Sequence, residues 1–158
     1  MSTYILSEGF REGDRAQIVA LLREYERDIG VSLCFQDFAA ELAGLPGAYA
    51  APLGTLILAR QTAGRALAGC VALRPVPAVI NLCEMKRLYV KETARKGGLG
   101  RQLAEAAIAA GRRLGYQRIC LDTLPSMLAA QGLYQSLGFR RVGFSAGEPR
   151  AILFERKV

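Results

Sequence analysis

The feature that most limits the fold is a strand-like segment that runs through a glycine turn directly into a helix-like segment. Residues 81 to 90 are typical of a strand, a turn containing Gly98 and Gly100 follows, and apolar residues then recur at helical spacing up to residue 114. Residues 118 to 122 are typical of a further, buried strand. A strand, a helix and a second strand in this order favour a parallel strand pair. The segment therefore predicts an α/β domain with a central sheet.

The remaining segments complete this sheet. Strands are expected over residues 3–6, 55–59, 66–73, 139–144 and 151–157, and helices over residues 14–29, 35–42 and 126–137. The turn-rich connection after residue 59 predicts an antiparallel hairpin, and Asp14 with Gln17 has capping-box spacing. We expect a single domain over residues 1–158, with a mixed central sheet of about six to seven strands flanked by about four helices.

The chain contains no histidine. This excludes Ser-His-Asp triads, Cys-His pairs, H-E-x-x-H zinc sites and every imidazole base. Proton chemistry must therefore use a carboxylate, a tyrosine, a cysteine, a lysine or water, and no metal site is predicted.

The four cysteines indicate a reducing compartment. Cys34, Cys70, Cys83 and Cys120 form no C-x-x-C pair, and the last three lie in apolar, strand-like stretches. Free cysteine is among the most buried residue types, so we expect reduced thiols and a cytoplasmic protein. The N-terminus lacks signal-peptide features, and prolines interrupt the longest uncharged run, residues 42–59, so no membrane span is expected.

The net charge of +7 lies unevenly along the chain. Residues 80 to 158 hold 14 of the 21 basic residues and 6 of the 14 acidic residues. This asymmetry fits an anionic partner, and it equally fits solvated surface arginines. Nucleic-acid binding is the weakest interpretation, because the basic segments do not alternate with aromatic residues.

The glycine turn is the best candidate for an anion site. Glycines let a ligand approach the backbone, and free N–H groups at a helix start attract phosphate oxygens. Arg95, Lys96 and Arg101 add positive charge there. The turn lacks the Gly-Lys-Ser/Thr of a Walker A loop, and Leu103 replaces the last small residue of a dinucleotide fingerprint.

Three segments resemble the GNAT (GCN5-related) N-acetyltransferase superfamily. Arg95-x-x-Gly98-x-Gly100 resembles its Q/R-x-x-G-x-G/A acyl-CoA pyrophosphate loop, residues 84–90 look like the strand before that loop in bacterial members, and residues 133–139 are similar to its "LYxxLGF" segment. The resemblance covers nearly the whole chain. It implies a GNAT-like (acyl-CoA N-acyltransferase) fold and transfer of an acetyl group from acetyl-CoA to a primary amine by direct attack.

The resemblance also implies site residues. Glu84 matches a general base and Tyr134 a general acid beside the CoA sulfur. Backbone groups of Leu88, Tyr89 and Val90 would bind the pantetheine arm, and the pyrophosphate would lie on the amides of Arg95, Lys96, Gly97, Gly98, Leu99, Gly100 and Arg101. Many relatives have a cofactor-binding asparagine where this chain has Met127, so either Ser126 replaces that contact or the contact is missing.

Alternatives remain at each point. Glu84 could be a structural carboxylate paired with Lys86 or Arg87, and Tyr134 a core aromatic residue. A non-catalytic CoA-binding sensor or interaction module would keep the fold without turnover. The acceptor, a small-molecule or peptide amine, is expected near Tyr25, Phe35, Phe38, Tyr49 and residues 144–150. An exposed sheet edge would allow two chains to form a homodimer.

Overall fold

The computed structural model describes residues 2–33, 37–147 and 150–158. The strands are β1 (Tyr4–Glu8), β2 (Thr55–Gln61), β3 (Leu67–Pro75), β4 (Leu82–Val90), β5 (Arg118–Thr123), β6 (Arg140–Phe144) and β7 (Ile152–Lys157). The α-helices are α1 (Arg15–Ile29), α2 (Phe38–Ala43), α3 (Leu99–Arg113) and α4 (Leu128–Ser136). The expected fold class, a mixed sheet of six to seven strands with four helices, is confirmed.

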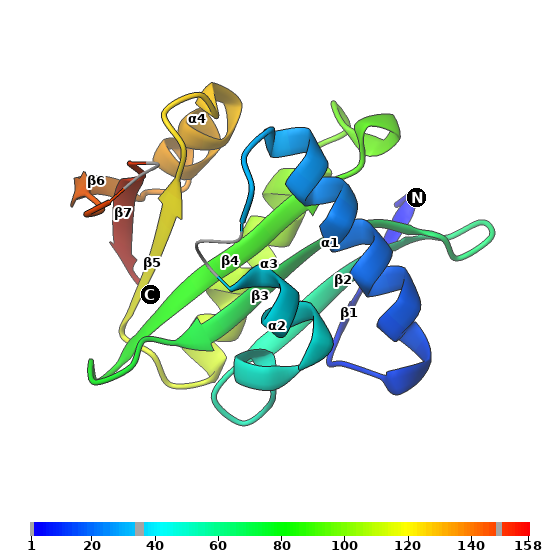
Figure 1. The fold of residues 1–158 in the computed structure, drawn as a ribbon, viewed down its shortest axis with the longest axis horizontal. Helices are drawn as coiled ribbons and strands as arrows, with labels where there is room; N and C mark the ends of the chain where they lie inside the picture. Colours follow the sequence, from blue (N-terminus) through cyan, green and yellow to red (C-terminus); the bar gives the residue numbers. More distant parts are fainter. Residues whose placement is uncertain (1, 34–36, 148–149) are drawn as a thin grey trace.

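All strands belong to one seven-stranded sheet with the order β1-β2-β3-β4-β5-β7-β6 (Figure 1). The pairs from β1 to β4 are antiparallel, as are β5 with β7 and β7 with β6. Among the strands that the structure describes, only β4 and β5 are parallel, and α3 connects them. The predicted hairpin between β2 and β3 and the predicted parallel pair are therefore both present.

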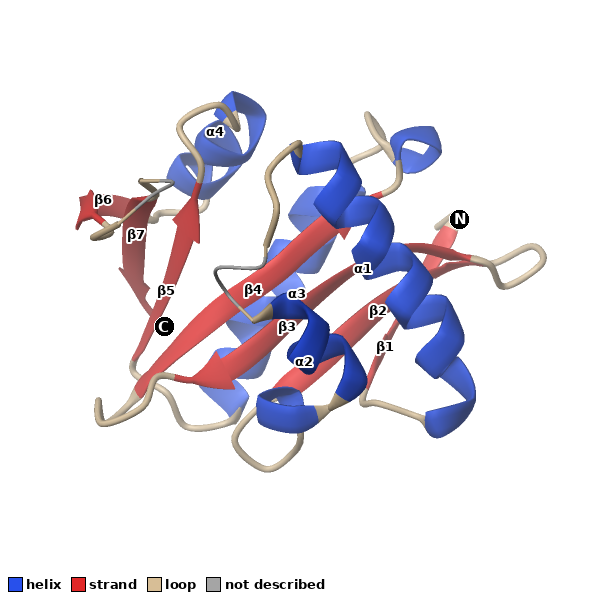
Figure 2. Cartoon of the chain, in the orientation of Figure 1, coloured by secondary structure: helices blue, strands red, loops and turns tan. Residues whose placement is uncertain are grey.

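Helices cover both faces of the sheet (Figure 2). Helices α1 and α2 lie on one face and α3 on the other. The strands bury side chains on both faces in alternation. In β2, for example, Leu56 packs in the cluster with Leu21 of α1, and Ile57 packs in the cluster with Leu103 of α3.

The start of α1 differs from the prediction. Asp14 precedes the helix but makes no capping hydrogen bond, so the predicted capping box with Gln17 is wrong. A short 3-10 helix, Glu12–Asp14, holds Asp14 in a helical conformation (φ −93°, ψ −9°) and not in the extended one that a capping side chain needs. Both side chains bind Arg60 of β2 instead, Asp14 at 2.7 Å and Gln17 at 3.1 Å.

The second predicted helix is shorter than expected. It begins at Phe38, and Phe35 lies outside the described residues. Within the described part of the chain, no helix is long and apolar enough to cross a membrane.

Candidate active site

The sheet opens between its two parallel strands. Strands β4 and β5 pair only from Leu82 with Arg118 to Glu84 with Cys120. Beyond these pairs, β4 continues to Val90 and β5 to Thr123, but the two strands no longer pair with each other. The edge of β4 that follows Glu84 therefore faces a gap, and Leu88, Tyr89 and Val90 lie on this open part of the strand.

A β-bulge at Arg87 changes which way the side chains of β4 point. The register with β3 shifts between the pairs Cys70–Tyr89 and Ala72–Lys86, and Arg87 has a φ of 62°. After the bulge, Leu88 packs toward the α3 face and Tyr89 toward the α1 face. The thiol of Cys70 donates a hydrogen bond of 3.3 Å to the Arg87 carbonyl.

The bulge residue is held by a buried ion pair. The side chain of Arg87 is 2% exposed, and its Nε and Nη2 donate to the two carboxylate oxygens of Glu41 at 2.9 and 2.8 Å. Its guanidinium also lies 4.9 Å from the ring centre of Phe38. Burial alone raises the pKa of Glu41, but the hydrogen bond and charge of Arg87 outweigh it, so that pKa lies below its ordinary value. Arg87 is thus a fixed structural cation.

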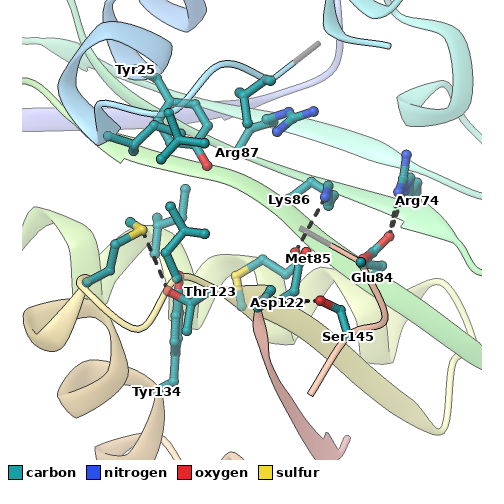
Figure 3. Close-up of a pocket in the computed structure, with 18 of the residues that line it drawn as sticks. Tyr25, Arg74, Glu84, Met85, Lys86, Arg87, Asp122, Thr123, Tyr134 and Ser145 are labelled. Atoms are coloured by element: carbon teal, nitrogen blue, oxygen red, sulfur yellow. Dashed lines mark hydrogen bonds and ion pairs between the residues drawn. The ribbon is translucent and has the colours of Figure 1, made fainter. Parts of the chain in front are cut away.

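A cavity of about 470 Å³ lies at the gap between β4 and β5 (Figure 3). It has walls from α1 and the segment after it, from β3, β4 and β5, from α4, and from the segment between β6 and β7. Its lining residues are Tyr25, Ile29, Val31, Leu33, Arg74, Glu84, Met85, Lys86, Arg87, Leu88, Asp122, Thr123, Leu124, Met127, Tyr134, Ser145, Ala146, Gly147 and Ala151.

Glu84 lies in the cavity wall and binds Arg74 (Figure 3). Arg74 stands directly opposite Glu84 in the β3–β4 register, so both side chains project from the same face. The Nε of Arg74 donates to Oε1 of Glu84 at 2.8 Å, and its Nη2 lies 2.8 Å from the same oxygen. The alternative pairing of Glu84 with Lys86 or Arg87 is wrong, because those side chains bind other carboxylates.

The second charged pair of the cavity joins the two separated strands. The Nζ of Lys86 lies 3.5 Å from Oδ1 of Asp122, which belongs to β5. Figure 3 shows this pair beside the Arg74–Glu84 pair. Ionic groups of both signs therefore line one region of the cavity.

Tyr134 faces the cavity from the opposite side. It belongs to α4, and Figure 3 shows it well apart from Glu84. Its ring packs against Phe139 at 5.8 Å and Phe154 at 6.2 Å between ring centres, so it is also a core aromatic residue. Among the described residues its hydroxyl has no hydrogen-bond partner, and it is not sealed from solvent. Burial raises the pKa of this phenol well above its ordinary value.

The glycine turn before α3 presents unused backbone amides. Gly98 has a φ of 82°, and no side chain caps the helix. The amide of Arg95, which was also predicted to bind the pyrophosphate, donates to the carbonyl of Glu92 at 3.3 Å. The N–H groups of residues 96 to 101 find no acceptor among the residues that the structure describes. Residues 96 to 98 are exposed, and a Cβ at Gly97 or Gly98 would meet nothing within 4 Å. The turn thus has the open donors that a diphosphate requires.

The three basic side chains around this turn have different contacts. Arg95 donates to Asp28 of α1 at 2.8 Å and to the carbonyl of Val90 at 2.9 Å. Arg101 donates to Ser136 of α4 at 2.5 Å, and the side chain of Lys96 is exposed. In this structure Arg95 therefore connects the turn to α1, which the sequence did not suggest.

The residue expected to replace the family asparagine does not line the cavity. Ser126 is exposed, whereas Met127 is a lining residue. The hydroxyl of Thr123 lies 3.7 Å from the sulfur of Met127. A thioether is a weak acceptor, so this position offers little hydrogen bonding to a ligand.

The residues expected near the acceptor are divided by the structure. Tyr25 and residues 145–147 line the cavity, whereas Phe38 and Tyr49 are buried and are not among its lining residues. Sequence reasoning missed Arg74 and Asp122 because each depends on strand register. Their charges within apolar strands were the signal that could have identified them.

Three thiols are described, and burial raises the pKa of each. The pKa of Cys70, Cys83 and Cys120 rises to about 12. Cys70 and Cys83 are buried and Cys120 is half-buried, whereas Cys34 lies outside the described residues.

The arrangement suits the transfer of an acyl group from a thioester that carries a diphosphate. The open edge of β4 and the free amides of the turn can bind an extended, phosphorylated donor, and the cavity can hold a second substrate beside it. The chain belongs to the acetyltransferase (GNAT) family, whose sequence model matches residues 16–139. It is an N-acetyltransferase, and membership of this family implies acyl-CoA as the acyl donor.

Relatives support this assignment. An uncharacterized N-acetyltransferase of Schizosaccharomyces pombe is 42% identical over 120 residues, which are 76% of this chain and 72% of that protein. The N-acetylaspartate synthetase of Danio rerio is 28% identical over 89% of this chain and 50% of its own length. A GNAT acetyltransferase structure from Staphylococcus aureus has a TM-score of 0.81 at 17% identity, with 98% of each chain covered, and shows the same fold.

Proposed function

We propose that this enzyme transfers an acetyl group from acetyl-CoA to an amine by direct attack, with Glu84 as general base and Tyr134 as general acid. The observation that supports the proposal is that a carboxylate and a phenol face one cavity from opposite sides, where the sheet opens. Direct attack requires an amine that loses a proton, a thiolate that gains one, and a fixed alignment of the two.

Glu84 is the proposed proton acceptor. Arg74 uses only its Oε1, and within the described structure Oε2 has no partner and is accessible to solvent. This oxygen takes the amine proton, directly or through one water. The nitrogen then forms the new bond to the acyl carbon, and the carbon–sulfur bond breaks.

Tyr134 is the proposed proton donor to the leaving sulfur. Because burial raises the pKa of its phenol, the hydroxyl keeps its proton throughout the physiological pH range. A protonated donor beside a developing thiolate lowers the barrier to its departure. The high pKa of Cys83 and Cys120 argues against an acyl-cysteine intermediate, because the thiolate is the nucleophile.

Backbone groups hold the donor in this proposal. The amides of residues 96 to 101 bind the pyrophosphate, and the open edge of β4 from Leu88 to Val90 binds the pantetheine arm. The unused donors of the turn and the end of β4–β5 pairing at Glu84 fit such a ligand. The Arg95–Asp28 ion pair holds the turn against α1.

The acceptor is a small-molecule or peptide amine, and the enzyme works in the cytoplasm. The buried thiols of Cys70 and Cys83 support a reducing compartment. A homodimer through the exposed edge strand β6, which carries Val142 and Phe144 at its surface, would appear as a doubled mass in light scattering.

Two measurements test the proposal. Calorimetry should detect acetyl-CoA binding, and thiol release should accompany acetylation of at least one amine from a mixed panel. Glu84→Gln should lower kcat/KM for the amine by roughly 100-fold or more and leave acetyl-CoA affinity unchanged. Arg113→Gln, in the surface pair with Glu8, is the matched control. Acetyl-CoA binding without thiol release for any amine would favour the CoA-binding sensor.

A further inference from the structure

The Arg74–Glu84 pair is bound through one carboxylate oxygen only. Nε and Nη2 of Arg74 both lie 2.8 Å from Oε1 of Glu84. In the bidentate Arg87–Glu41 pair, by contrast, each nitrogen meets its own oxygen. The one-oxygen geometry leaves Nη1 of Arg74 and Oε2 of Glu84 without partners among the described residues.

Both unused atoms belong to side chains that line the cavity. Neither is a buried atom that lacks a partner, and the side chains of Arg74 and Glu84 are 35% and 20% exposed. The pair therefore leaves one cationic donor and one anionic acceptor unused. A ligand that satisfies both must carry an anionic group and an amine.

An α-amino acid has this pattern, because its amine and its carboxyl group are attached to the same carbon atom. We propose that the acceptor is a free α-amino acid, whose carboxylate binds Nη1 of Arg74 while its amine faces Oε2 of Glu84. The inference rests on the proposed function, since it assigns the substrate class of the same site. Arg74 is a specificity residue here, and Glu84 remains the base.

The rest of the cavity is compatible with this ligand. The nearby Lys86–Asp122 pair keeps the charge of that region balanced, which suits a zwitterion better than a simple amine or a simple acid. Ile29, Val31 and Leu33 provide an apolar wall for a side chain. A peptide N-terminus fits less well, because an amide replaces its carboxylate and leaves the Arg74 donor unpaired.

The test compares matched acceptors that differ at the carboxyl group. L-Alanine, L-leucine, L-phenylalanine and L-aspartate are each compared with the corresponding α-amide, and L-leucine also with 3-methylbutylamine, by thiol release at saturating acetyl-CoA. We expect at least one acid to exceed its amide in kcat/KM by roughly tenfold or more, as a lost charged hydrogen bond implies. The amides hold more unprotonated amine at neutral pH, so basicity alone would favour them.

Variants assign the effect to Arg74. Arg74→Gln should remove most of the preference for acid over amide, while Arg113→Gln should keep it. Direct binding of the preferred acid to the free enzyme, measured by NMR line broadening, should weaken roughly tenfold in Arg74→Gln and not in Arg113→Gln. Circular dichroism and acetyl-CoA affinity show whether the variant remains folded.

The outcomes separate the two proposals. If amides or 3-methylbutylamine are acetylated as well as every acid, the amino-acid inference is overturned and the acetyltransferase proposal stands. A preference that survives in Arg74→Gln also overturns it. If no acetyl-CoA binds and no amine releases thiol, the proposed function itself fails.

Discussion

The sharpest prediction concerns the hydroxyl of Tyr134. Tyr134→Phe removes one oxygen atom and keeps the ring, which packs against Phe139 and Phe154. Because that hydroxyl has no partner among the described residues, its removal leaves no buried group unsatisfied. The free energy of unfolding should therefore change by less than about 0.5 kcal/mol.

Catalysis should respond far more strongly than stability. General acid catalysis contributes about 10²- to 10⁴-fold, and we expect a loss near the lower end because water can reach the hydroxyl. A 100-fold decrease in kcat corresponds to about 2.7 kcal/mol in the barrier. Acetyl-CoA affinity should stay within about threefold, because the proposed donor contacts use the turn amides and β4.

The assay measures kcat by thiol release at saturating substrates, Kd for acetyl-CoA by calorimetry, and stability by urea unfolding. Tyr4→Phe, on strand β1 and outside the cavity, is the matched control for kcat and stability and should leave both unchanged. A Tyr134→Phe enzyme with kcat within about twofold of the parent would refute the general-acid role. A large loss of stability would instead show that the hydroxyl is structural.

Three further predictions concern the turn and the bulge. Gly98→Ala should weaken acetyl-CoA binding by roughly 5- to 30-fold, because alanine is strained at a φ of 82°. Gly100 has room for a Cβ, so the acetyl-CoA affinity of Gly100→Ala should stay within about threefold of the parent. Equal affinities of the two variants in calorimetry would contradict this prediction. Glu41→Ala should lower the free energy of unfolding by about 3 to 5 kcal/mol, because it leaves the buried Arg87 cation without its partner. The double variant with Arg87→Met should regain most of the lost stability, and urea unfolding measures both changes. The pKa of Glu41 is depressed in the folded state, so the stabilisation by its carboxylate is present above the ordinary pKa of 4.5 and is lost as the pH falls below that value. The difference in the free energy of unfolding between the parent and Glu41→Ala should therefore narrow between pH 6 and pH 3. A difference that stays constant over this range would contradict the ion pair.

The sequence predicted the fold well because the informative patterns are local. Apolar residues at helical spacing from residue 99 onward and the glycines at 98 and 100 lie within one strand–turn–helix segment. Such patterns need no knowledge of distant residues, and α3 follows the turn as expected. The capping box failed for a local reason too, because the preceding turn changed the backbone of Asp14.

The ionic pairs of the cavity were beyond such reasoning. Arg87 and Glu41 lie 46 residues apart, and Lys86 and Asp122 lie 36 apart. Their contacts depend on strand register and on the bulge, which a periodic pattern does not specify. Glu84 was predicted to be a site residue, but its partner Arg74 follows only from the β3–β4 pairing.

The bulge also determines which face of the sheet the side chains of β4 occupy. In β4, Met85 faces α3, and regular alternation would turn Arg87 toward the same apolar core. The cost of an unpaired guanidinium there would be several kcal/mol. The extra residue instead places Arg87 with Glu41 on the α2 side and returns Leu88 to the α3 face. The pairing of β4 with β5 ends at Glu84, and the bulge begins three residues later at Arg87. Strand β4 thus exposes the Glu84 carboxylate on one face and, after it, a backbone edge that does not pair with β5.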